Sequence, residues 1–300
     1  METAVHSPTR DVYSAITTKI IAAIEAGAGD FVMPWHRPLV GIGRPRNATT
    51  AANYRGVNIV ALWAEAMLSG FASGYWASYK QWQTVGAQVR KGERGAVIVF
   101  YRELDQPTLP LDTTTTDEAN RRFIARASYV FNAEQVDGWS PPDQPPASTI
   151  EPCDAAEELV RRSRATVRDG HSSAYYDYQV DRICLPQPEC FVGTPTSTPT
   201  ESYYSTLLHE LVHWTGATHR LSRPFDRFGT EVYAREELVA ELGAAFLCGD
   251  LAIANEPRPD HAAYVASWLK ILKDDSRAIF RAARLAEQAI EYLHSLQEQT

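Results

Sequence analysis

The chain has 300 residues, of which 44% are hydrophobic and 22% are charged, and its net charge is −8. This length favours about two domains, and the composition is that of an ordinary globular protein with a sizeable core. The longest apolar runs fall far short of the roughly 20 residues needed to span a bilayer. The first residues lack the pattern of a signal peptide, and the four cysteines form no CxxC pair. We therefore expect a cytoplasmic protein without membrane partners, disulfide framework or thiolate zinc site.

The charge is distributed unevenly along the chain. Residues 1–102 contain eleven Lys or Arg and six Asp or Glu, a net charge of +5, which leaves −13 for the remainder. A basic first third joined to an acidic remainder indicates two parts with different partners.

Helix and strand patterns are mixed in the first half. Apolar residues at helical spacing between Thr9 and Gly27 predict a helix, and Pro, Gly and Arg predict a loop from Met33 to Tyr54. In chain order we then expect helices at 57–70 and 78–87, strands at 96–102 and 125–136, and a mobile loop between them at 103–121. Five prolines in residues 138–152 predict a linker.

The second half reads mainly as helices. In chain order we expect a helix at 154–170, one or two strands at 173–186, a helix from about 200 to 216, a helix from 230 to 247, and two helical segments over 260–297 that break near residue 274. The fold class predicted is α+β, with part boundaries at 1–138, 139–152 for the linker and 153–300. We expect each part to form a core of its own.

The stretch "LLHELVHWTG" suggests a metal site. His209 and His213 are four residues apart on one expected helix, so both imidazoles can reach one ion. Glu210 lies between them, which completes an HExxH motif. In this motif the histidines bind zinc and the Glu is the general base. The alternative is an amphipathic helix that merely carries three polar residues.

An enzymatic zinc site usually needs a third protein ligand. The next helix offers Glu236, Glu237 and Glu241. We favour Glu237 as ligand, with Glu241 supporting a ligand histidine from behind. Glu236 remains an alternative because the rotation of the helix is not fixed by the sequence. His219 is a lesser candidate for the third ligand.

Tyr233 precedes Glu237 by one helical turn. It is a candidate for polarising a carbonyl oxygen in a transition state. A packing role for the ring is the simpler interpretation.

Residues 44–102 combine positive charge with aromatic rings. They contain eight Lys or Arg against two Asp or Glu, together with nine aromatic residues. Cations for phosphates and rings for bases are what sequence-tolerant binding of single-stranded DNA requires. The candidate phosphate contacts are Arg44, Arg46, Lys80, Arg90, Lys91 and Arg94, and the candidate stacking rings are Tyr54, Trp76 and Trp82. The alternative is that most of these rings belong to the core.

Two long blocks of the chain resemble a known family. The stretch from "MPWHRP" through "RNATTAANYRGVNIVALW" to "VRKGERGAVIVFY" looks like the N-terminal single-stranded-DNA-binding domain of ArdC-type antirestriction proteins, which also occurs in TraC-type primases. The blocks "YYSTLLHELVHWTGATHRL" and "YAREELVAELGAAFL" resemble the metallopeptidase domain that follows it in ArdC proteins. The likeness covers about residues 8–295 and is weakest at 103–122.

The resemblance implies a plasmid-encoded protein that shields incoming DNA from restriction during conjugation. It also implies a gluzincin-like fold in the second part, with one Zn²⁺ or a similar divalent ion per chain. A metallopeptidase would act as a hydrolase on peptides, and a protein of the restriction system is the candidate substrate. The alternative function is a non-catalytic protein that coats single-stranded DNA and has a structural metal site.

Overall fold

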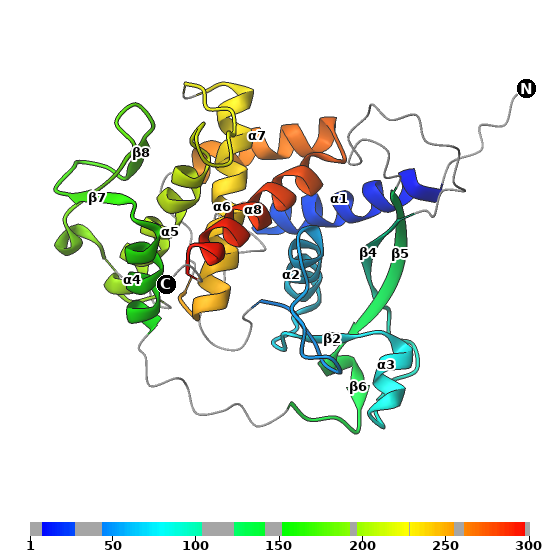
Figure 1. Ribbon diagram of the computed structural model, residues 1–300. Coiled ribbons are helices and arrows are strands. Elements are labelled where there is room, and N and C mark those ends of the chain that lie inside the picture. Colours follow the sequence, from blue (N-terminus) through cyan, green and yellow to red (C-terminus); the bar gives the residue numbers. More distant parts are fainter. Residues whose placement is uncertain are drawn as a thin grey trace, which may run out of the picture.

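The computed structural model describes residues 8–27, 44–103, 123–141, 152–192, 197–227, 229–254 and 261–297. Most of the expected loop at 103–121, most of the linker at 138–152 and the first part of the loop expected before Tyr54 lie outside these residues. The architecture mixes helices and strands, as predicted (Figure 1). None of the described helices is long and apolar enough to cross a membrane.

The N-terminal part is built on two helices and a four-stranded sheet. Helices α1 (Pro8–Gly27) and α2 (Val57–Ser69) pack against each other, and α2 ends on Gly70 in the left-handed conformation that glycine adopts without strain. The sheet has the order β1-β2-β5-β4, in which only the pair β1–β2 is parallel. Its strands are β1 (Arg46–Asn47), β2 (Tyr75–Ala77), β4 (Ala96–Glu103) and β5 (Phe123–Asn132).

A smaller unit closes one end of this sheet. Helix α3 (Tyr79–Thr84) begins at Ser78, whose hydroxyl accepts a hydrogen bond from the amide of Gln81 in a capping box. Strands β3 (Gln88–Val89) and β6 (Val136–Asp137) pair in antiparallel fashion, and the short 3₁₀ helix η3 (Ala133–Gln135) links β5 to β6. Together they form a separate hydrophobic cluster around Trp82.

The described residues of the C-terminal part form five α-helices and a three-stranded sheet. The helices are α4 (Pro152–Ser163), α5 (Pro199–Thr215), α6 (Glu231–Leu251), α7 (His261–Asp274) and α8 (Ala278–Ser295). The sheet has the order β7-β9-β8 and contains β7 (Thr166–Asp169), β8 (Tyr175–Asp177) and β9 (Arg182–Leu185). The 3₁₀ helix η4 (Pro188–Cys190) follows β9.

One predicted element is wrong. The helix expected over 154–170 ends at Ser163, and residues 166–169 form β7. Arg164 has φ 60°, a left-handed backbone conformation that ends the helix. The remaining residues pair in parallel with β9, so tertiary pairing decides a segment whose local pattern favours a helix.

Helix α6 lies at the centre of the molecule. Almost every residue from Ala234 to Cys248 is buried, and the helix contacts α4, α5, α7 and α8. A helix buried on all sides belongs to the interior of a fold. Its N-cap is Thr230, whose hydroxyl accepts a hydrogen bond from the amide of Tyr233.

The two parts share one hydrophobic core, contrary to the expectation that each has its own. A single cluster of buried residues runs from Ile16 in α1 and Trp63 in α2 to Phe246 in α6 and Leu293 in α8. Helix α1 packs against α7, and α2 packs against α8 (Figure 1). The boundaries at 138 and 153 stay predictions about the chain and do not mark a break in the core.

Candidate metal centre

The HExxH motif lies in the buried second half of α5. The helix begins with a capping box in which Thr198 and Glu201 satisfy each other's backbone amides, with Pro199 at the first helical position. His209, Glu210 and His213 are all buried. The ring centroids of the two histidines are 4.8 Å apart. The motif therefore faces the protein interior, against α6.

Three side chains from two helices converge at this point. One ligand atom from each of His209, His213 and Glu237 lies within 4.8 Å of the other two. Glu237 Oε2 is 3.6 Å from His209 Nε2, and Glu237 Oε1 is 3.4 Å from His213 Nε2. Ligand atoms at 2.0–2.1 Å from a tetrahedral ion are about 3.4 Å apart. The donor set and its spacing therefore fit a divalent metal ion, and of the three candidates for the third ligand it is Glu237 that faces both Nε2 atoms.

The other ring nitrogen of each histidine faces a second carboxylate. Glu241 Oε2 is 3.5 Å from His209 Nδ1, and Glu236 Oε1 is 3.2 Å from His213 Nδ1. A carboxylate at Nδ1 fixes the ring orientation and leaves Nε2 to bind the metal. The sequence-based role of Glu241 behind a ligand histidine fits this geometry, and Glu236 has the equivalent position behind the other histidine.

Glu236 is itself held by Arg223. The guanidinium donates from Nε and Nη2 to the Glu236 carboxylate at 2.9 and 2.8 Å, and it also donates to the Thr215 hydroxyl and the Val212 carbonyl. Arg223 is 4% exposed. Arg223 carries no signal in the sequence that marks this role, because it lies in an irregular segment where no periodicity links it to the helices.

The site favours positive charge. Burial opposes the charged imidazole of His213, but hydrogen bonds to Glu236 and Glu237 outweigh it and raise the pKa to about 10. Burial likewise opposes the Glu237 carboxylate, yet its hydrogen bonds with His209 and His213 hold its pKa well below the usual range. Arg223 pairs with Glu236, and the Glu237 carboxylate, which lies between the two Nε2 atoms, would likewise favour a divalent cation there.

His219 and Tyr233 lie outside the ligand set. His219 is exposed, and its Nε2 is 3.4 Å from Asp181 Oδ2. Tyr233 is half-buried and packs against the core at the start of α6. Packing accounts for Tyr233, and its catalytic role stays a prediction.

The candidate DNA-binding residues divide into buried and exposed groups. Arg44 is 9% exposed and pairs with Asp250 at 2.9 Å and Glu287 at 2.6 Å, so it links the two parts of the molecule and is not accessible to a phosphate. The prediction that Trp76 and Trp82 stack on bases is also wrong. Trp76 is buried in the large hydrophobic cluster and Trp82 in the small one, so neither ring is accessible to DNA.

Tyr54 is buried as well. Its burial raises the pKa of the phenol to about 12 despite the opposing hydrogen bond from Asn47. The large rings that the sequence analysis selected pack well in a core, and their burial depends on tertiary contacts that composition does not show. The cations at Arg46, Lys80, Arg90, Lys91 and Arg94 are exposed and remain candidates.

Comparisons with known proteins agree with the two-part organisation. The model of the N-terminal domain of anti-restriction factor ArdC matches residues 10–131. The model of a zincin-like metallopeptidase matches residues 154–285. Both matches cover the segments that the sequence analysis assigned to these families.

Solved structures and relatives extend the likeness to nearly the whole chain. The Mn(II)-bound crystal structure of the antirestriction protein ArdC from plasmid R388 has 34% identity and a TM-score of 0.72, and the match covers 96% of this chain and 98% of that one. Its metal-free form has 35% identity and a TM-score of 0.72, over 95% and 97% of the two chains.

Two relatives differ in length. Protein y4eC of Sinorhizobium fredii is 44% identical over 290 residues, 96% of this chain and 92% of y4eC. DNA primase TraC of Escherichia coli is 37% identical over 310 residues, but the match spans only 28% of the primase. The likeness to TraC therefore concerns one portion of that protein.

Proposed function

The chain belongs to the ArdC family of antirestriction proteins, and from this premise we propose that it binds single-stranded DNA and protects incoming conjugative DNA from host restriction. We further propose that the zincin-like part is a zinc-dependent metallopeptidase. The observation that carries the second proposal is the convergence of His209, His213 and Glu237, with Glu210 of the same motif buried beside them.

The proposed chemistry assigns a role to each residue. The ion would be held by Nε2 of His209, by Nε2 of His213 and by a carboxylate oxygen of Glu237. A bound zinc ion would lower the pKa of a water to near 7 and polarise a peptide carbonyl. Glu210 would accept the proton of that water and deliver it to the leaving amine. Glu236 and Glu241 would keep the two imidazoles in the orientation that presents Nε2.

The small sheet offers a docking edge for an extended peptide. Strand β8 lies at the edge of β7-β9-β8 and contacts α5, the helix of the metal centre. No other strand of the described residues pairs with its outer edge. A peptide added to this edge would gain main-chain hydrogen bonds next to the proposed catalytic groups. The candidate substrate is a protein of the restriction system.

Positive charge in the N-terminal part supports DNA binding. Arg46, Lys80, Lys91 and Arg94 are exposed and form no ion pair with any carboxylate of the described residues. Unpaired surface cations attract phosphates and make affinity fall as salt rises.

The decisive variant is Glu210→Gln, which keeps the size and polarity of the side chain but removes the base. Conjugation into a host with an active restriction system measures protection, while metal content and DNA affinity are measured on the same purified protein. Loss of protection with unchanged metal and DNA binding supports hydrolysis. Full protection by the variant contradicts the catalytic role of Glu210 and favours a DNA-coating protein with a structural metal site.

A further inference from the structure

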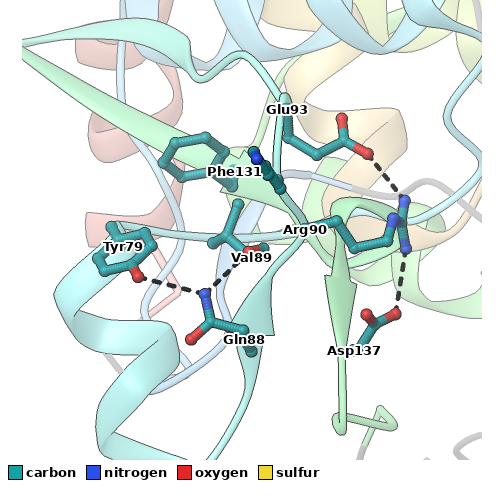
Figure 2. Close-up of a pocket in the computed structure, with 8 residues that line it drawn as sticks. Tyr79, Gln88, Val89, Arg90, Glu93, Phe131 and Asp137 are labelled. Carbon is teal, nitrogen blue, oxygen red and sulfur yellow. Dashed lines mark hydrogen bonds and ion pairs between the residues drawn. The ribbon is translucent and has the colours of Figure 1, made fainter.

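A pocket of about 550 Å³ opens in the N-terminal part between α3, β3, β5 and β6. Its size is within the 300–1,000 Å³ that is usual for ligand sites. Figure 2 shows that aromatic and apolar side chains, among them Tyr79, Val89 and Phe131, line one side. Arg90 and its carboxylate partners line the other side. The pocket is lined by residues between 79 and 137, whereas the metal centre lies on helices α5 and α6, so the proposed peptidase chemistry does not explain the pocket.

The aromatic side offers a flat surface with polar groups at its edge. Tyr79 is 42% exposed, and its ring meets Phe131 edge to face with centroids 6.5 Å apart. Gln88 Nε2 donates to the Tyr79 hydroxyl at 3.2 Å and to the Val89 carbonyl at 2.9 Å (Figure 2). These bonds orient the amide, and they leave the Tyr79 hydroxyl hydrogen and the Gln88 carbonyl oxygen for a ligand. A ring face beside a donor and an acceptor suits a nucleobase.

On the charged side, two adjacent cations have different surroundings. The Arg90 guanidinium lies 3.0 Å from Glu93 Oε1 and 3.5 Å from Asp137 Oδ1, and it also donates to the carbonyl of Glu134. Its charge is therefore compensated. Lys91 is exposed and forms no ion pair within the described part of the chain. Lys91 is the pocket cation that remains available for a phosphate.

The apolar side of the pocket packs on the small hydrophobic cluster around Trp82. Trp82 is fully buried beneath it, and its indole nitrogen donates to the carbonyl of Phe131 at 3.0 Å. Trp139 packs on Trp82 with ring centroids 5.2 Å apart, and Val136 completes the small hydrophobic cluster. A preformed pocket loses little conformational entropy when a ligand binds.

We propose that this pocket takes one nucleotide of single-stranded DNA. The base stacks on the open face of Tyr79, beside Gln88 and Phe131, and the phosphate lies at Lys91. The inference rests on the proposed DNA binding and gives it a site. A base in a duplex is paired and stacked, so only an unpaired strand can offer its ring face to Tyr79. This requirement gives the protein a physical basis for preferring single strands.

The test measures the affinity of the full-length protein for a fluorescently labelled oligothymidylate by anisotropy. Tyr79→Ala should weaken binding about tenfold, because base stacking on one ring is lost. Tyr79→Phe keeps the ring and should bind within about threefold of wild type. Lys91→Glu should weaken binding at low salt and reduce the slope of log affinity against log salt by about one unit.

Two matched controls separate the pocket from general effects. Phe100→Ala removes a ring that is 55% exposed on β4, opposite Arg126 in the β4–β5 pair. Lys270→Glu makes the same charge change on α7, which lies well apart from α3 in Figure 1. Both controls should bind like wild type, and melting temperatures should show that all the variants are folded.

A second measurement locates the base directly. An oligonucleotide that contains 5-iododeoxyuridine should form a photo-cross-link to the peptide with Tyr79. If wild type binds single strands while Tyr79→Ala and Lys91→Glu bind equally well, the pocket assignment is overturned and DNA binding stands. If wild type shows no binding, the proposed function itself fails.

Discussion

His209 and His213 each have both ring nitrogens facing neighbouring carboxylates, and this arrangement gives the three glutamates of α6 different roles. Glu237 faces both Nε2 atoms, whereas Glu236 and Glu241 each face one Nδ1. A glutamate at Nε2 can share a metal ion with the histidines, and one at Nδ1 can only orient a ring.

Metal content should distinguish these roles. Replacement of His209, His213 or Glu237 by Ala removes a ligand, and we expect the purified variants to lose their metal. Glu236→Ala and Glu241→Ala keep all three ligands, and metal affinity should fall about 10–100-fold. Elemental analysis after dialysis against a metal buffer measures both effects. Retention of full metal content by the double histidine variant would contradict the metal centre, and loss in Glu236→Ala but not Glu237→Ala would reverse their roles.

Arg223 should matter for stability more than any exposed arginine. Arg223→Met removes the guanidinium that donates to the buried Glu236 carboxylate from both Nε and Nη2, and the free energy of unfolding should fall by about 3–5 kcal/mol. Urea denaturation of the metal-free protein measures this change without a contribution from metal binding.

Arg235→Met is the control for that measurement. Arg235 pairs with Glu231 on the same helix, but their side chains are 39% and 67% exposed. Such a surface pair contributes about 0–1 kcal/mol. An equal decrease in the free energy of unfolding in the two variants would show that the Arg223–Glu236 pair stabilises the fold no more than a surface pair does.

The sequence predicts the neighbours of some residues but not of others. The spacing of His209 and His213 is enough to predict a shared ion, because helix geometry brings positions four apart together. The choice among Glu236, Glu237 and Glu241 depends on the rotation of α6 relative to α5, and only tertiary packing fixes it. The same limit applies to Trp76 and Trp82, whose burial depends on tertiary packing that the sequence does not show.

The crossing of α5 and α6 determines the spacing of the metal ligands. A Cβ atom on Gly243 would lie 2.8 Å from Cγ2 and 2.9 Å from Cγ1 of Val212. Val212 is fully buried, and a β-branched side chain in a helix has essentially one χ1 rotamer, so it cannot move aside. Gly243 therefore permits a closer approach than any other residue would allow.

Gly243→Ala should move the two helices apart. Overpacking costs about 1–3 kcal/mol, and the gain from replacing a helical glycine is at most about 1 kcal/mol. We expect a lower melting temperature and weaker metal binding, because His213 follows Val212 directly and Glu241 is two residues from Gly243.

A double variant tests the cause. Val212→Ala removes the two methyl groups that obstruct the new Cβ, so Gly243→Ala should cost less in that background and the two changes should be non-additive. Additive losses would mean that the glycine acts through something other than this contact.

Elements with a strong local signal were predicted well. Helices α5 (Pro199–Thr215) and α6 (Glu231–Leu251) begin within a residue of the expected starts near residues 200 and 230. The tail divides into α7 and α8 at the expected break. The segment that forms β7 was missed because its strand character depends on a partner, β9, which is distant in sequence.

At the level of the complete chain, the linker divides the sequence into two parts, but the two parts share one hydrophobic core. Arg44 of the N-terminal part is buried between Asp250 of α6 and Glu287 of α8. Trp63 of α2 meets Phe246 of α6 with ring centroids 5.8 Å apart. Composition and prolines indicate where the chain changes character, but they carry no information on how the two sides pack. The two family models likewise match residues 10–131 and 154–285, on either side of the linker, and do not describe how the two parts pack.

A cut within residues 142–151 should therefore leave the two fragments associated. After cleavage at an inserted protease site, we expect them to co-elute in size-exclusion chromatography and to separate only in denaturant, because α1 and α2 bury apolar surface against α7 and α8. In the cleaved protein, Arg44→Met removes the cation that pairs with Asp250 and Glu287, whose side chains are only 19% and 13% exposed, and the fragments should separate at a lower denaturant concentration. The matched control is Arg55→Met, because Arg55 also forms an ion pair between the two parts, to Glu291 at 3.4 Å, but both side chains are exposed.

Fragments that separate in buffer and each unfold cooperatively would contradict the shared core and restore the expectation of two independent domains.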